Sequence, residues 1–212
     1  MTFPYNFIAI EGCIGAGKTQ LSKKIAERLN ARLILEQFED NPFLPKFYKD
    51  KRRYSFPLEI SFLAARYQQL SAELQPRSLF QNYTVSDYII GKCLLFSRIN
   101  LDADEFSLYH KIFEIIQANV PSPDLFIYLH NTYENLLRNI QLRGRPYEQD
   151  IDLEYLSNIN EGYLQLIKNL PGLRILILDT SKIDFVNNES HFDAIYQLIH
   201  QQYEPGIHRI SL

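Results

Sequence analysis

The feature that most constrains the fold is a glycine-rich loop between a short apolar segment and an amphipathic one. Residues 5–11 read YNFIAIE and are typical of a buried strand. Residues 18–29 then carry Leu21, Ile25 and Leu29 on one face of a predicted helix, and residues 32–35 form another apolar run. A strand, a glycine loop, a helix and a second strand make a βαβ unit. This unit predicts a parallel sheet covered by helices.

The loop matches the phosphate-binding pattern, in which two glycines separated by four residues are followed by lysine and threonine. Its members are Gly12, Cys13, Ile14, Gly15, Ala16, Gly17, Lys18 and Thr19. Glycine lets the chain turn so that backbone N–H groups point at phosphate oxygens, and the following helix adds its positive end. The pattern predicts a site for a nucleoside triphosphate such as ATP. In that site Lys18 would reach the outer phosphates, and the Thr19 hydroxyl would bind Mg²⁺.

The rest of the chain continues the alternation of strands and helices. Apolar runs at residues 83–87, 125–129 and 173–178 predict further strands, and helical spacing appears at 63–74, 108–118, 133–142, 156–170 and 192–203. Pro76 and Pro171 are expected to end two of these helices. Five strands separated by helices, without a linker or repeat, predict one doubly wound α/β domain over residues 1–212, with a five-stranded parallel sheet.

Composition excludes several classes of protein. The net charge is -3, from 22 Lys+Arg against 25 Asp+Glu, so binding to nucleic acid is not expected. No apolar run is long enough for a bilayer, and the amino terminus does not resemble a signal peptide, so we expect no membrane contact. Two cysteines, Cys13 and Cys93, cannot form a disulfide framework, which favours a reducing, cytoplasmic location. The five histidines lack the spacing of metal ligands.

Two carboxylates follow predicted strands and are expected near the loop, because ligands bind at the carboxyl ends of parallel strands. Glu36 could accept a proton from a substrate hydroxyl, or be a solvated loop acid. Asp87 could hold Mg²⁺ directly or through water together with Thr19, or cap the next helix. Arg143 and Arg145 flank a glycine. They could form a cationic lid over a triphosphate, or simply end a helix.

Taken together, these segments resemble the deoxynucleoside kinase family, particularly its bacterial deoxyadenosine and deoxyguanosine kinase branch, which is similar in turn to thymidylate kinase. The resemblance runs nearly end to end and rests on residues 7–19, 36–44, 86–87, 123–129, 143–148, Asp179 and 184–188. It implies a P-loop NTPase-type α/β fold with a lid at about 143–150. It also implies ATP-dependent phosphorylation of the 5′-hydroxyl of a deoxyribonucleoside for nucleotide salvage, with Mg²⁺ and commonly as a homodimer.

The resemblance also implies roles for individual residues. Glu36 would be the general base, acting with Lys18 and the lid arginines Arg143 and Arg145. Tyr48 and Glu148 would hold the 3′-hydroxyl of the deoxyribose. Asp179, Asp184 and Phe185 would border the adenine of the phosphate donor.

Two positions depart from the family pattern. Glu59 stands where the family usually places a glutamine that reads the base, and Asp87 is followed by Tyr88 instead of arginine, so that Arg66 is one candidate for the missing contact. An ionised carboxylate only accepts hydrogen bonds, and guanine alone offers it two adjacent donors. Glu59 therefore predicts that deoxyguanosine is the preferred substrate and deoxyadenosine the second, unless Glu59 pairs with Arg66 or another cation.

Base stacking and two rival functions remain open at this level. Phe43 and Phe96 are candidates to stack on the base, although core packing is the default for each. Residues 62–66 (FLAAR) faintly resemble the acceptor-phosphate helix of nucleoside monophosphate kinases, which favours a thymidylate-like kinase as the alternative. A nucleotide-binding regulator without catalysis is the alternative of another class. Retention of the lysine, the carboxylates and the lid arginines argues against it.

Overall fold

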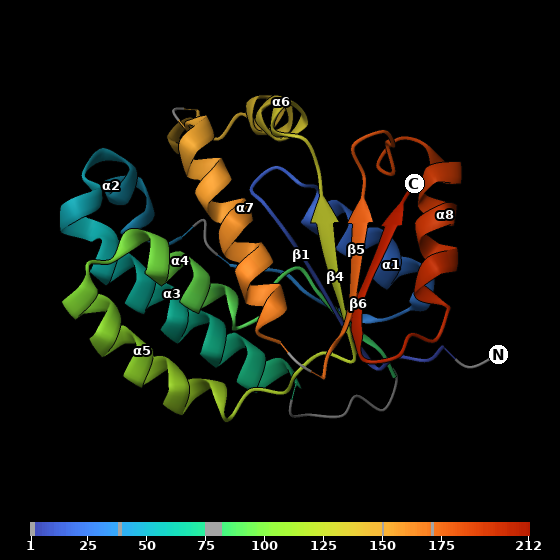
Figure 1. The fold of residues 1–212 in the computed structure, drawn as a ribbon, viewed down its shortest axis with the longest axis horizontal. Helices are drawn as coiled ribbons and strands as arrows, with labels where there is room; N and C mark the ends of the chain where they lie inside the picture. The colour runs from blue at the N-terminus through green and yellow to red at the C-terminus, as the bar shows by residue number, and fades with distance from the viewer. Residues whose placement is uncertain (1–2, 38–39, 75–81, 150, 171) are drawn as a thin grey trace.

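The computed structural model of the chain describes residues 3–37, 40–74, 82–149, 151–170 and 172–212. Within them, six parallel strands form one sheet in the order β2-β3-β1-β4-β5-β6. The strands are β1 (Phe7–Gly12), β2 (Arg32–Ile34), β3 (Thr84–Ser86), β4 (Leu125–His130), β5 (Arg174–Asp179) and β6 (Gly206–Ser211). Helices lie on both faces of the sheet, as Figure 1 shows. This arrangement is the predicted parallel α/β fold.

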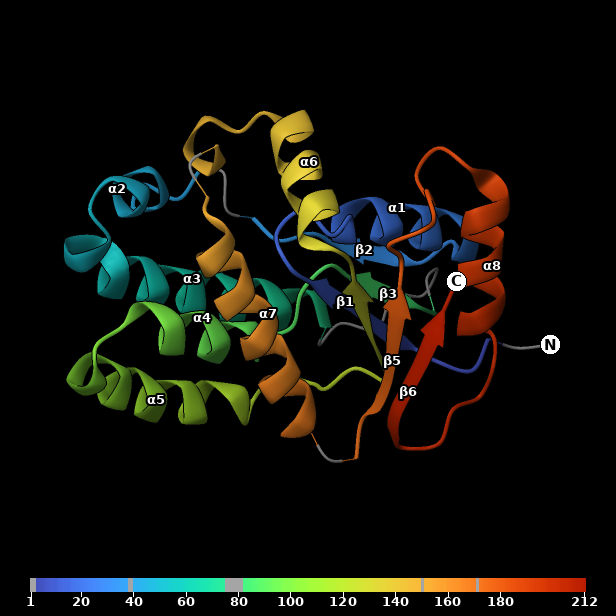
Figure 2. The same cartoon turned by 45° about the horizontal axis from the view of Figure 1, so that its top comes forward.

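The helices divide between the two sides of the sheet. They are α1 (Lys18–Leu29), α2 (Leu44–Lys49), α3 (Lys51–Leu74), α4 (Lys92–Asn100), α5 (Ala103–Gln117), α6 (Tyr133–Arg143), α7 (Leu153–Lys168) and α8 (Glu189–Ile199). Helices α1 and α8 lie on one side, and α3, α4, α5 and α7 gather on the other (Figure 2). Side-chain oxygens of Asp102, Thr132, Asp152 and Asn188 cap four of the helices by accepting backbone N–H groups.

The prediction of five strands was wrong by one, because β6 was missed. Its side chains alternate between half-buried and exposed, and Ile207 is exposed, so the segment lacks the continuous apolar run of a buried parallel strand. It pairs along its length with β5, from Gly206 beside Arg174 to Ser211 beside Asp179. The last helix ends at Ile199, short of the predicted limit at 203, which leaves room for this edge strand.

The hydrophobic core includes β1, the buried strand that leads into the glycine loop. All six residues of β1 are buried, and Ala9 and Ile10 are fully inaccessible. A second apolar cluster, which includes Leu63, Leu70 and Tyr109, fills the space between α3, α4 and α5. None of the helices in the described ranges is long and apolar enough to cross a membrane. The expected helix ends at Pro76 and Pro171 lie outside the described residues.

Two glycines with positive φ separate the effect of backbone strain from that of crowding. Gly15 in the loop has φ +84°, and a Cβ there would lie 2.6 Å from the carbonyl oxygen of Leu136, whereas Gly172 has φ +88° and nothing within 4 Å. We expect Gly172→Ala to lower the free energy of unfolding by about 1–2 kcal/mol from the left-handed backbone alone. Gly15→Ala adds a clash with backbone, for about 2–5 kcal/mol in all. Urea unfolding of both variants measures the difference, and equal losses would show that the approach of α6 to the loop is not tight.

Candidate active site

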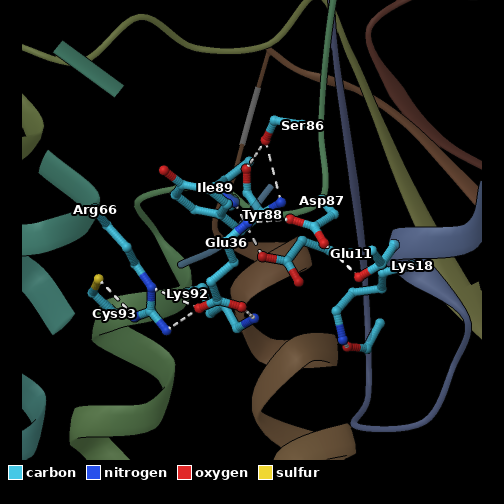
Figure 3. Close-up of polar contacts among 12 residues, drawn as sticks. Glu11, Lys18, Glu36, Arg66, Ser86, Asp87, Tyr88, Ile89, Lys92 and Cys93 are labelled. Carbon is cyan, nitrogen blue, oxygen red and sulfur yellow. Dashed lines mark hydrogen bonds and ion pairs between the residues drawn. The ribbon is translucent and has the colours of Figure 1, made fainter. Parts of the chain in front are cut away.

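The glycine loop turns around the side chain of Lys18 at the carboxyl end of β1. The Lys18 ammonium donates to the carbonyl oxygens of Gly12 at 2.9 Å and Cys13 at 3.0 Å, so the lysine lies folded along the loop (Figure 3). Burial, together with the nearby Lys92 charge, lowers the pKa of Lys18 to about 8. Glu11, Glu36 and Asp87 partly oppose this decrease, and an incoming polyphosphate would add further negative charge beside the ammonium. Cys13 is buried and burial raises its pKa to about 11, which fits a spacer within the loop.

Thr19 and Asp87 lie together, as their sequence positions predicted. The Thr19 hydroxyl donates to Asp87 Oδ2 at 2.6 Å, and the backbone N–H of Glu36 donates to Asp87 Oδ1 at 2.7 Å. Asp87 therefore joins the end of β2 to the start of α1. A hydroxyl and a carboxylate are hard oxygen ligands, and Mg²⁺ usually takes only one or two protein ligands beside phosphate oxygens and water. The pair fits that donor set, and no group of three or more ligating side chains occurs elsewhere in the described ranges.

Glu36 lies between two buried cations. Arg66 Nε donates to Glu36 Oε1 at 2.9 Å, and Lys92 Nζ lies 2.7 Å from Oε2, with the three side chains between 6% and 11% exposed. Burial alone would raise the pKa of Glu36, but Lys92 and Arg66 hold it well below its usual range. Glu36 is therefore ionised at neutral pH. The two cations that bind Glu36 come from different helices, Arg66 from α3 and Lys92 from α4 (Figure 3).

Sequence reasoning missed Lys92 and a second buried carboxylate, Glu11. Glu11 is fully buried, accepting the backbone N–H of Ile89 at 3.1 Å and the Tyr163 hydroxyl at 2.6 Å. Burial raises the pKa of Glu11, while the charges of Lys92 and Lys18 oppose that shift. A charged residue at the end of an otherwise apolar strand was the available signal for Glu11. The signal for Lys92 was weaker, since α4 was not predicted.

A cleft of about 480 Å³ lies beside α2 and α7. Its wall includes Tyr48, Tyr147 and Tyr155, and the rings of Tyr48 and Tyr147 stack with centroids 5.7 Å apart. Glu148 is buried nearby, where both predicted lid arginines contact it. Arg145 Nη1 lies 3.3 Å from Glu148 Oε1, and Arg143 makes a shorter contact with Oε2. The structure thus brings Tyr48, Glu148 and the arginines together at one end of the site.

Glu59 lies inside the molecule and is 1% exposed. Its Oε1 accepts the Asn100 amide at 2.7 Å, and its Oε2 has no hydrogen-bond partner among the described residues. The hydrogen bonds of Arg66 go to Glu36 and to Cys93 Sγ, so the alternative in which Arg66 neutralises Glu59 is not the arrangement observed. Asn100, at the end of α4, is a third residue that the sequence analysis did not single out, after Lys92 and Glu11.

The remaining predicted residues lie around this centre. Phe185 packs so closely on Gly17 of the loop that a Cβ at the glycine would lie 2.8 Å from the phenylalanine ring. Asp179 and Asp184 accept backbone N–H groups of their own turns. Phe43 packs in an apolar cluster with Phe47, and Phe96 lies near Lys92 and packs against the main core. Both phenylalanines therefore have packing roles in the structure.

The parallel sheet, the glycine loop with its lysine, and the carboxylates of Glu36 and Asp87 at the strand ends define a P-loop phosphotransferase. The sequence profile of the deoxynucleoside kinase family matches residues 8–203. Deoxyguanosine kinase of Bacillus subtilis is 37% identical over 193 residues, 89% of this chain and 93% of that one. Deoxyadenosine kinase of Dictyostelium discoideum is 35% identical, over 93% of this chain and 79% of its own.

Solved structures give the same result. A deoxyadenosine kinase from M. mycoides with bound dCTP superposes with a TM-score of 0.78 at 26% identity, covering 91% of this chain and 98% of that one. The chain belongs to the deoxynucleoside kinase family. Membership makes it a phosphotransferase whose acceptor is a deoxynucleoside.

Proposed function

We propose that this enzyme transfers the γ-phosphoryl group of ATP to the 5′-hydroxyl of a purine deoxynucleoside, with deoxyguanosine preferred to deoxyadenosine. One observation carries the proposal: Glu36 is fixed by Arg66 and Lys92, and its backbone is bound to the same Asp87 that contacts Thr19 of the glycine loop. A hydroxyl acceptor at Glu36 would therefore lie next to the phosphates in the loop. Relatives that act on purine deoxynucleosides, at 37% and 35% identity, support the acceptor class.

In the proposed reaction the protein supplies position and charge more than covalent chemistry. Backbone N–H groups of the loop and the Lys18 ammonium hold the β- and γ-phosphates of the donor. Thr19 and Asp87 would hold Mg²⁺, which neutralises charge on the phosphate oxygens when it is bound. Arg143 and Arg145 belong to the lid proposed at about residues 143–150, of which residue 150 lies outside the described residues. On closing, these arginines would break their contacts with Glu148, bind the transferring phosphoryl group and exclude water.

The low pKa of Glu36 determines how this carboxylate would act. A strongly stabilised anion is a weak base, so its first contribution is to accept a hydrogen bond from the 5′-hydroxyl and aim the oxygen at phosphorus. In a loose phosphoryl-transfer transition state the hydroxyl proton leaves late, when the oxygen has already become acidic. Glu36 then takes that proton. Arg66 and Lys92 are positioning residues that keep the acceptor oxygen in place.

The site is less suited to the competing acceptor, a nucleoside monophosphate, than to a nucleoside. It would need a free arginine near residues 62–66 for its phosphate, and Arg66 is already bound to Glu36 and Cys93. The proposal therefore takes the neutral nucleoside as acceptor.

We also propose that residues 1–212 act as one domain and assemble as a homodimer. We place the enzyme in the cytoplasm, where thiols such as Cys13 and Cys93 stay reduced.

The purine preference is expected to depend on Glu59. At a pH above neutrality the ionised carboxylate accepts two donors of guanine, which is worth about 1–3 kcal/mol, or roughly tenfold or more in kcat/KM over deoxyadenosine. Glu59→Gln, whose amide both donates and accepts, is expected to reverse the order. Measuring kcat/KM for the four deoxynucleosides tests this, with the exposed Glu161→Gln as control. A wild type that favours thymidine, or an order unchanged by Glu59→Gln, contradicts the assignment.

A further inference from the structure

The carboxyl group of Glu59 has one satisfied oxygen and one free oxygen in a buried position. Asn100 donates its amide to Oε1 at 2.7 Å, while Oε2 is inaccessible to solvent and has no hydrogen-bond partner in the described ranges. A buried polar atom without a partner costs free energy, so a residue keeps one where something else completes it. Oε1 retains a second lone pair beside Oε2. Together they form an edge that can meet two adjacent polar atoms of a flat ligand.

Asn100 connects this edge to the cleft. The Tyr155 hydroxyl donates to Asn100 Oδ1 at 3.4 Å, which turns the amide N–H₂ toward Glu59, and Tyr155 itself lines the 480 Å³ cleft beside Tyr48 and Tyr147. The chain of contacts runs from the cleft wall to the buried carboxyl. Glu59 itself does not line the cleft, so the proposal requires that a base displace the side chains that cover Glu59 beside Tyr155.

We propose that Glu59 and Asn100 form a purine-reading pair whose single exchangeable proton selects the base: the ionised carboxylate takes guanine and the protonated carboxyl takes adenine. The inference rests on the proposed function and adds a condition to it. Guanine offers the N1–H and the exocyclic N–H₂, and both need acceptors. Adenine offers the N6–H₂ as donor and N1 as acceptor, so it needs one oxygen that accepts and one that carries a proton.

The surroundings of Glu59 allow both protonation states near neutral pH. Burial raises the pKa of Glu59 to about 7, against the opposing effects of the Asn100 hydrogen bond and the Arg66 charge, and the Glu36 charge reinforces the increase. The other titratable groups that face it are Cys93 from α4, Tyr109 from α5 and Tyr155 from α7. Burial raises the pKa of all three, so they stay neutral over this range. The proton on Glu59 is thus the one that changes.

The experiment is a competition between deoxyguanosine and deoxyadenosine in one reaction, from about pH 6 to pH 8. The ratio of products gives the ratio of the two kcat/KM values, in which the pH dependence of Glu36, Lys18 and the phosphates cancels. If each ionisation state reads one purine, the ratio of ionised to protonated Glu59 changes tenfold per pH unit. We expect the preference for deoxyguanosine to rise by up to about tenfold for each pH unit across this range, which lies on both sides of the Glu59 pKa of about 7.

Two variants separate this mechanism from a general effect of pH. Glu59→Gln removes the proton, so its purine ratio is expected to be independent of pH. Asn100→Ala removes a hydrogen bond that stabilises the ionised form, so this variant should reach any given purine ratio at a higher pH than the wild type does. A wild-type ratio that is flat with pH, or a slope retained in Glu59→Gln, overturns the inference while deoxynucleoside phosphorylation stands. Failure to phosphorylate either purine at any pH overturns the proposed function as well.

Discussion

Replacing Glu36 with glutamine is expected to lower kcat for deoxynucleoside phosphorylation by about a hundredfold or more, with ATP binding nearly unchanged. Glutamine keeps the shape of the side chain but cannot take the hydroxyl proton. Glu36 does not contact the loop directly, since its link to Thr19 passes through its own backbone N–H and Asp87. The donor site should therefore survive the change. Steady-state kinetics with saturating donor, and titration with a fluorescent ATP analogue, measure the two effects separately.

The same substitution leaves Arg66 and Lys92 without their shared anion, so the fold must be checked. Urea unfolding of Glu36→Gln shows whether enough native protein remains, and the exposed Glu27→Gln on α1 serves as a charge-matched control. Glu27→Gln should keep full activity. A folded Glu36→Gln enzyme that turns over at the wild-type rate would remove Glu36 from the reaction.

Replacing Lys92 with methionine is expected to lower the free energy of unfolding by about 3–5 kcal/mol and to reduce kcat as well. Lys92 acts on two buried carboxylates, because it binds Glu36 at 2.7 Å and its charge also opposes the raised pKa of Glu11. Methionine fills similar volume but leaves Glu36 with Arg66 alone. The acceptor hydroxyl then meets a less firmly held carboxylate.

The loss of stability in Lys92→Met should depend on pH. Without Lys92 the pKa of Glu11 in the folded state rises further above its value in the unfolded chain. The folded state then binds more protons, and stability falls as pH increases. The difference from wild type should accordingly be largest where Glu11 is ionised and Lys92 is still protonated, and it should shrink as the pH falls and Glu11 becomes protonated. Urea unfolding across a pH series measures it, with the exposed Lys111→Met as control. A difference that grows on acidification contradicts this account.

The sequence predicted the elements whose local pattern matches their environment. The run 5–11, the loop and the helix from Lys18 to Leu29 agree with the structure because a buried parallel strand is a short continuous apolar run, whereas an amphipathic helix repeats its apolar residues every three to four positions. Edge strand β6 and the short helices α2 and α4 were missed. Their residues are held by neighbours distant in the sequence, and their own patterns are weak.

The same distinction applies to the site. Glu36, Asp87 and Thr19 could be placed together because they follow strands that end at one edge of the sheet. The contacts of Glu36 with Lys92, and of Glu59 with Asn100, join positions 56 and 41 residues apart across helices. No local spacing encodes such pairs. Whether Glu59 met Arg66 or Asn100 depended on how α3 and α4 pack, which only the folded arrangement decides.

Strand order has a consequence for how the chain acquires its fold during synthesis. β1 is made first and lies in the interior of the sheet, yet its neighbours β3 and β4 begin only at residues 84 and 125. More than half of the polypeptide must therefore leave the ribosome before the first strand is paired on both sides. Until then β1 is an apolar segment without its two neighbouring strands, and nascent chains with such exposed segments aggregate or bind chaperones.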